Sequence, residues 1–76
     1  MSPAQQLEFV LRGEFIALDA LLKATGLAPS GGLAKAMVAQ GEVSVDGQTE
    51  LRKTCKIRAG QIVGCAGRSI RVLAAP

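Results

Sequence analysis

The spacing of the apolar residues changes at Gly41. Before that point, Leu18, Leu21 and Leu22 recur at the i, i+3, i+4 spacing of one helix face. After it, apolar and polar residues alternate in short runs separated by glycines, which predicts strands. The chain therefore has to pack a helical unit against a sheet that follows it. A second helical stripe is predicted from Leu33, Ala34, Met37 and Val38.

Two short helices are predicted before Gly41. The first spans residues 19–25, and the second spans residues 31–40. Ser30 precedes the second helix and is suited to cap it, because its hydroxyl can accept a hydrogen bond from a backbone N–H of the first turn. Gly31 and Gly32 weaken that turn but allow another backbone to approach closely. Since the link between the helices is short, we expect them to pack against each other.

The region after Gly41 contains three turn signals. Asp46-Gly47 is a strong signal for a two-residue type I′ hairpin, and Ala59-Gly60 and Ala66-Gly67 mark two further turns. Leu51 to Arg58 is predicted to be an irregular basic stretch. The strands predicted around these turns are residues 43–45, 61–65 and 69–73, with Ile70 and Val72 in the core and Arg71 on the opposite face.

The opening segment is ambiguous. Leu7, Phe9 and Leu11 alternate as in a strand, whereas Leu7, Val10 and Leu11 also fit a helix face, and the sequence leaves both open. Residues 15–18 are predicted to be extended. The predicted fold class is α+β, with two short packed helices followed by a small antiparallel β-sheet of three or four strands. We expect one domain over residues 1–76.

The core has to be aliphatic, since the chain has two phenylalanines and no tyrosine or tryptophan. Phe9 and Phe15 both have apolar neighbours and are expected in that core. Hydrophobic residues make up 49% of the chain, so we expect folding without a metal or a disulfide. Cys55 and Cys65 are accordingly expected to be free thiols that are buried or half-buried.

Several classes of function are disfavoured by composition. The chain has no histidine, which excludes a Ser-His or Cys-His dyad and the usual zinc ligand sets. It also has no recognisable pair of catalytic carboxylates, so we expect neither an enzyme nor a bound cofactor or metal. No apolar run approaches the roughly 20 residues of a membrane helix. The N-terminus lacks the pattern of a signal peptide, so we expect a cytoplasmic protein.

Charge is segregated along the chain. Residues 1–50 hold three basic and six acidic residues, whereas residues 51–76 hold six basic residues and no acid. Arg52, Lys53, Lys56 and Arg58 fall within seven residues, and such a cluster repels itself unless an anion neutralises it. Because arginine grips phosphate with two parallel hydrogen bonds, this stretch is a candidate polyanion-binding surface. The alternative is a charged loop that serves only solubility.

The order of these features resembles the RNA-binding domain named after small-subunit ribosomal protein S-four, in its short stand-alone bacterial form. The resemblance covers roughly residues 14–73. It implies the alpha-L motif, in which two helices are wrapped by a β-sheet. The matching positions are Leu18-Asp19, Leu22-Lys23, Ser30, Ala34-Lys35, Gly41, Val43, Val45-Asp46-Gly47, Lys56, Gly60-Gln61 and Val63.

The resemblance implies that the two helices and the basic stretch form one face that meets RNA, which adds Lys23 and Lys35. The amino end of the second helix is a further candidate, because its backbone N–H groups are unpaired donors that suit a phosphate. Arg68 and Arg71 are expected to be solvent-facing strand residues without a role in binding. The predicted RNA-binding residues are Lys23, Ser30, Gly31, Gly32, Lys35, Arg52, Lys53, Lys56 and Arg58.

We therefore expect a monomeric protein that binds structured RNA, such as ribosomal or transfer RNA. With both phenylalanines assigned to the core, recognition should use phosphates, 2′-hydroxyls and helix shape instead of stacked bases. Two alternatives remain open. One is a module that docks on a ribosomal or RNA-processing protein, and the other is a helix-turn-helix DNA binder, since the two predicted helices have a short link.

Overall fold

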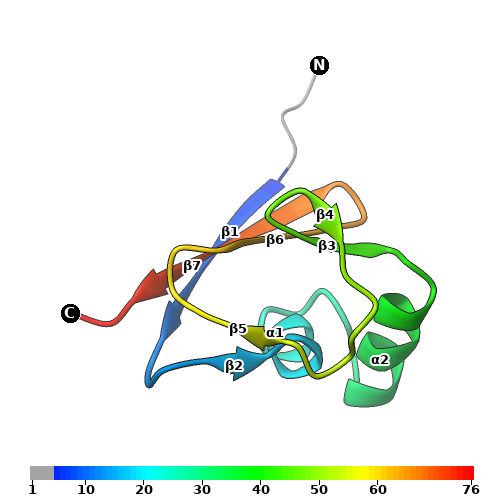
Figure 1. The fold of residues 1–76 in the computed structure, drawn as a ribbon, viewed down its shortest axis with the longest axis horizontal. Coiled ribbons are helices and arrows are strands. Elements are labelled where there is room, and N and C mark those ends of the chain that lie inside the picture. Colours follow the sequence, from blue (N-terminus) through cyan, green and yellow to red (C-terminus); the bar gives the residue numbers. More distant parts are fainter. Residues whose placement is uncertain (1–4) are drawn as a thin grey trace.

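The computed structural model describes residues 5–76, in which a five-stranded sheet lies above two helices and a small two-stranded sheet (Figure 1). The helices are α1 and α2, and they pack against each other as expected. The elements in chain order are β1 (Gln5–Leu11), β2 (Ile16–Ala17), α1 (Leu18–Ala24), α2 (Gly31–Ala39), β3 (Val43–Val45), β4 (Gln48–Thr49), β5 (Lys56–Ile57), β6 (Ile62–Cys65) and β7 (Arg68–Ala74).

The larger sheet is mixed. Its strand order is β1-β7-β6-β3-β4, and all neighbours are antiparallel except β1, which runs parallel to β7. The opening segment is therefore a strand, with Leu7 opposite Ile70 and Phe9 opposite Val72. The predicted antiparallel sheet after the helices is confirmed in β3, β4, β6 and β7, and β1 adds a parallel strand at its edge, whose pairing the sequence did not predict. A parallel pair needs a long crossover connection, and here both helices lie between the two strands.

The core is aliphatic, as predicted, and lies between the larger sheet and the helices. Leu18, Leu21 and Leu22 of α1 are fully buried. Strand β7 contributes Ile70 and Val72, while Arg71 between them faces solvent, as predicted. Of the four residues in the apolar stripe predicted for α2, Ala34 and Val38 are fully buried. The other buried residues of this core are Leu11, Ala28, Val43, Ile57, Val63 and Cys65.

Two residues assigned to the apolar interior lie at the surface instead. Phe15 is 44% exposed, because it precedes β2 in the turn that follows β1, and the buried contact of that pairing is made by Ile57. Leu33 is 45% exposed, because α2 turns Ala34, Met37 and Val38 toward the core and leaves Leu33 outside that face. Phe9 is half-buried and packs against the core, as expected.

The two glycines that begin α2 are not needed for close packing within the described chain. A Cβ atom built on Gly31 would meet no other atom of residues 5–76 within 4 Å, and one on Gly32 would meet only the Ser30 hydroxyl, at 4.0 Å. No other segment among residues 5–76 makes use of the close approach that these glycines allow. Among residues 5–76, no helix is long and apolar enough to cross a membrane.

Both two-residue hairpins have the positive φ angles of a type I′ turn. Asp46 and Gly47 have φ angles of 52° and 84°, and Val45 pairs with Gln48 beside them, as predicted. The β6–β7 turn has the same form, with φ angles of 52° at Ala66 and 76° at Gly67. Alanine tolerates this conformation poorly, because its Cβ approaches the following carbonyl oxygen.

Ala66→Asn is expected to raise the free energy of unfolding by about 1 kcal/mol, because asparagine adopts the left-handed conformation at lower cost. Urea denaturation monitored by circular dichroism measures the change. The control is Ala59→Asn, at an exposed turn position that lies outside the left-handed region. An equal gain in both variants would contradict strain at Ala66.

Candidate functional site

The basic stretch after β4, residues 51–58, is hydrogen-bonded to the start of α1 and is here called the basic loop. No side chain caps this helix, since the residue before it is Ala17. The backbone N–H of Leu18 donates to the carbonyl of Cys55 (2.9 Å), and the N–H of Asp19 donates to the carbonyl of Lys53 (3.1 Å). The first N–H groups of a helix have no partner within the helix. The loop supplies those partners and is thereby held against α1.

Three segments that each carry a lysine meet around Asp19. The lysines are Lys23 of α1, Lys35 of α2 and Lys53 of the loop. The Lys35 ammonium lies 4.0 Å from the Asp19 carboxylate, which joins α2 to α1. The hydrogen bond from Asp19 to Lys53 brings the loop to the same place, and Lys23 lies one helical turn after Asp19. The Lys35 side chain is 53% exposed, so its ion pair is weak and screened by salt. All three lysines face solvent.

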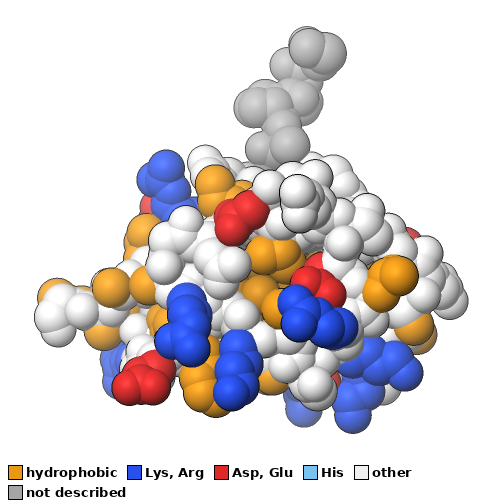
Figure 2. All heavy atoms as spheres, viewed as in Figure 1, with side chains coloured by type: hydrophobic (Ala, Val, Ile, Leu, Met, Phe, Trp, Pro, Cys, Tyr) orange, Lys and Arg blue, Asp and Glu red, His pale blue; other side chains and the backbone are white. Residues whose placement is uncertain are grey.

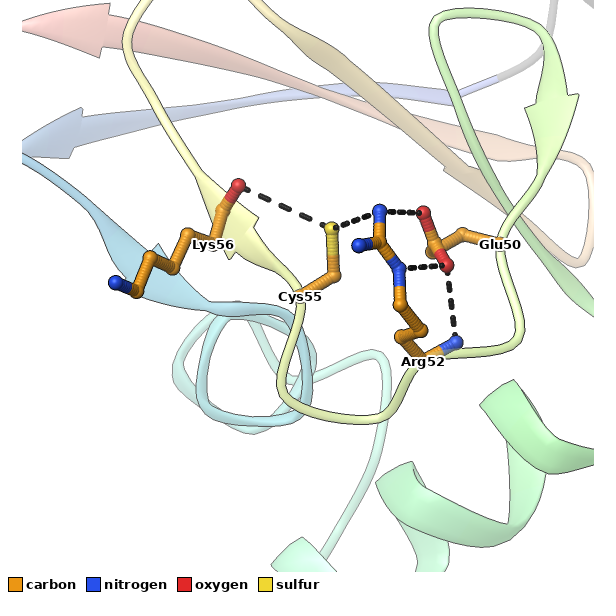
Figure 3. A network of polar contacts seen from close by, with 4 residues as sticks. All are labelled: Glu50, Arg52, Cys55 and Lys56. Carbon is orange, nitrogen blue, oxygen red and sulfur yellow. Dashed lines mark hydrogen bonds and ion pairs between the residues drawn. The ribbon is translucent and has the colours of Figure 1, made fainter.

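Arg52 is held in place by Glu50. Its Nε and Nη2 atoms donate to the two oxygens of the Glu50 carboxylate at 3.0 and 3.1 Å, and its backbone N–H donates to Oε2 at 3.0 Å (Figure 3). These hydrogen bonds lower the pKa of Glu50 to about 2. The Arg52 side chain remains 77% exposed. Glu50 was not identified from the sequence, although its position two residues before Arg52 was an available signal.

A shallow hollow lies beside this pair. Its volume is about 430 Å³, and its lining residues are Arg52, Thr54, Cys55 and Lys56. The Cys55 sulfur lies 3.7 Å from Nη2 of Arg52, and the thiol donates to the Lys56 carbonyl at 3.9 Å (Figure 3). Burial raises the pKa of the Cys55 thiol, which keeps it neutral near pH 7. Cys55 and Cys65 are both free thiols, half-buried and buried respectively, as predicted.

Lys56 contacts the exposed ring of Phe15. Strand β5 pairs with β2, and this pairing sets Lys56 opposite Ala17. The Lys56 ammonium lies 4.8 Å from the centroid of the Phe15 ring, which is a cation–π contact. Because sequence reasoning assigned Phe15 to the core, it did not identify this residue as part of the site.

The remaining predicted residues lie around this centre. Arg58 directly follows β5 and is exposed, and its backbone N–H donates to the side chain of Gln61 at 2.7 Å. Ser30 caps α2 as expected, with its hydroxyl accepting from Leu33 N–H at 3.2 Å. Among residues 5–76, no hydrogen bond links Ser30, Gly31 or Gly32 to the basic loop. The structure therefore does not join this helix end to the loop.

The charges form a band across one face. Figure 2 shows Lys and Arg side chains along the lower half of this view, over β5, the loop before it and the adjoining part of α2. Arg68 and Arg71 belong to β7 in the other sheet and are exposed, as expected. Among residues 5–76, no group of three or more His, Cys, Asp or Glu side chains is suited to hold a metal ion.

Comparison with known proteins assigns the chain to a family. The family model described as "S4 domain" matches residues 9–73. The chain therefore belongs to the S4 domain family, which confirms the resemblance to the domain of ribosomal protein S-four.

Two curated relatives and one solved structure are similar over most of the chain. "Putative RNA-binding protein YbcJ" of Escherichia coli (strain K12) is 54% identical over 54 residues, which are 71% of this chain and 77% of that protein. "Uncharacterized protein YbcJ" of Shigella flexneri matches to the same extent. The solution structure of E. coli YbcJ, described as an alpha-L motif involved in RNA-binding, has a TM-score of 0.68 and 43% identity. The match covers 97% of this chain and 92% of that one. The predicted alpha-L fold is confirmed.

The Glu50–Arg52 pair is expected to make part of the stability depend on pH. Since the pKa of Glu50 is lowered from 4.5 to about 2, its contribution is complete above about pH 4.5 and is lost as the pH falls through about 2. Thermal unfolding between pH 2 and 5 measures this effect. Glu50→Gln should be less stable than the wild type at pH 5, and the difference should shrink steadily as the pH falls toward 2.

The control for this comparison is Glu14→Gln, which removes an exposed carboxylate in the turn between β1 and β2. A stability difference for Glu50→Gln that stays constant between pH 2 and 5 would contradict the assigned role of the pair.

Proposed function

We propose that this protein binds structured RNA, such as ribosomal or transfer RNA, through the face formed by α1, α2 and the basic loop. The observation that carries the proposal is the pair of hydrogen bonds from the start of α1 to the loop. They attach the loop to α1, and α2 packs against α1 on its own account, so that exposed cations from three segments belong to one unit. These are Lys23, Lys35, Arg52, Lys53 and Lys56. Membership in the S4 domain family and the description of E. coli YbcJ as involved in RNA-binding support it.

Binding in this proposal begins with phosphates. The lysines attract the RNA backbone and release counterions, which gives affinity without sequence information. Arg52 is already oriented as a planar fork by Glu50, and a phosphate oxygen pair can replace that carboxylate. Arg58 and the Ser30–Gly32 turn extend the surface beyond this centre. In this proposal the protein is a binding module and not an enzyme, and it uses no cofactor. It acts as a monomer in the cytoplasm.

The triple variant Lys35→Ala, Lys53→Ala, Lys56→Ala should bind RNA more weakly and with a smaller dependence on salt. Each phosphate that the variant no longer neutralises should reduce the slope of log K against log salt by about 0.7 to 1. Fluorescence anisotropy with transfer RNA and a labelled RNA hairpin between 50 and 200 mM salt provides the measurement. Duplex DNA of equal length serves as the comparison for a helix-turn-helix mode.

The matched control is the double variant Arg68→Ala, Arg71→Ala, which removes exposed cations from β7 only. An unchanged slope in the triple variant, or an equal loss of affinity in the control, would contradict the assigned face. Equal or tighter binding of duplex DNA would favour the DNA-binding alternative. A partner that stays bound after ribonuclease treatment would favour the protein-docking alternative.

Glu50→Gln should bind RNA more tightly than the wild type, by roughly threefold or more, because Glu50 competes with phosphate for Arg52. Glu14→Gln changes the net charge by the same amount without touching Arg52, and it should have the smaller effect. Anisotropy titrations of both variants at one salt concentration test this. Weaker binding by Glu50→Gln would instead mean that the carboxylate mainly orients the arginine for binding.

A further inference from the structure

Phe15 is the exposed aromatic residue of this chain. The chain has two aromatic side chains, and Phe9, which lies on β1 opposite Val72, packs against the core. The Phe15 ring is 44% exposed. A single exposed apolar residue is common on protein surfaces and needs no explanation by itself. What distinguishes Phe15 is its position beside Lys56, at the edge of the face that carries the proposed RNA-binding cations.

The pairing of β2 with β5 determines this position. Ile16 lies opposite Ile57, and Ala17 lies opposite Lys56, so Phe15 directly precedes the pairing. Ile57 is fully buried and Ile16 is half-buried, so the apolar contact of the small sheet does not depend on the Phe15 ring. The ring remains at the surface with the Lys56 ammonium 4.8 Å from its centroid.

Lys56 connects this ring to the rest of the site. Its backbone accepts a hydrogen bond from Cys55 and helps to line the hollow beside Arg52. Its side chain extends away from Arg52, as Figure 3 shows, and its ammonium reaches the ring. An apolar ring, a mobile cation and an oriented guanidinium therefore follow one another along the surface.

We propose that Phe15 is a stacking platform for one unpaired base of the RNA, with Lys56 binding the adjacent phosphate. This inference rests on the proposed function and narrows its ligand to a helix interrupted by an unpaired nucleotide. Bases stack on aromatic rings whatever their sequence, and the unpaired bases of bulges and loops are free to do so. It also revises the prediction that recognition avoids stacked bases, because that prediction assumed a buried Phe15.

The test uses three RNA hairpins with the same stem. One has a single bulged adenosine, one has an abasic nucleotide at the bulge, and one is fully paired. The proteins are the wild type, Phe15→Leu, which keeps an apolar contact for the Lys56 stem, and Phe15→Trp, which keeps a ring. Val10→Ala is the control, because Val10 is 47% exposed on β1. Circular dichroism melts confirm that each variant folds.

The wild type should bind the bulged adenosine about tenfold more tightly than the other two hairpins, given the usual size of base–aromatic stacking. Phe15→Leu should lose this preference and keep the affinity for the paired hairpin. Phe15→Trp and Val10→Ala should retain the preference.

Two outcomes would overturn the stacking platform while leaving RNA binding intact. One is equal affinity of the wild type for all three hairpins. The other is an equal drop in affinity of Phe15→Leu for all three, which would assign the ring a structural role only. Absence of binding to any hairpin at 50 mM salt would count against the proposed function itself. The stacking role of Phe15, which rests on that function, would then be excluded as well.

Discussion

Two hydrogen bonds from the start of α1 to the loop before β5 determine how this surface is built. They satisfy the N–H groups of Leu18 and Asp19, which no side chain caps. In doing so they attach a stretch of little regular structure to a helix whose other side is in the core. Because α2 packs against α1, the cations of the loop, α1 and α2 then belong to one packed unit.

The chain neutralises part of its own basic surface. The Glu50 carboxylate accepts three hydrogen bonds from Arg52, and Asp19 lies within ion-pair distance of Lys35. Both carboxylates reduce repulsion among the cations and hold side chains that would otherwise lose rotamer freedom on binding. In the proposed mode of binding, each carboxylate would have to give way, at least partly, to a phosphate. Arg52 is thus the oriented cation of the proposed surface, and part of the binding free energy there would be used to exchange one anion for another.

Sequence reasoning selected the cations of the proposed site but not the residues that contact them. Arg52, Lys53 and Lys56 follow from charge density, and Lys35 follows from the family resemblance. Glu50 and Phe15 were missed for different reasons. Glu50 belongs to the acidic half of the chain when charges are counted by segment, although it folds beside Arg52. Phe15 has apolar neighbours in sequence, and only the pairing of β2 with β5 shows that the buried contact is made without it.

What the sequence determined by itself is the local structure. Helix periodicity, the Ser30 cap and the Asp46-Gly47 turn depend on residues close together in the chain, so their physics is readable from it. The tertiary structure decided the parallel pairing of β1 with β7 and the attachment of the basic loop to α1. These features join segments far apart in sequence through backbone hydrogen bonds. Because such bonds carry no side-chain signature, only the fold reveals which backbone groups meet.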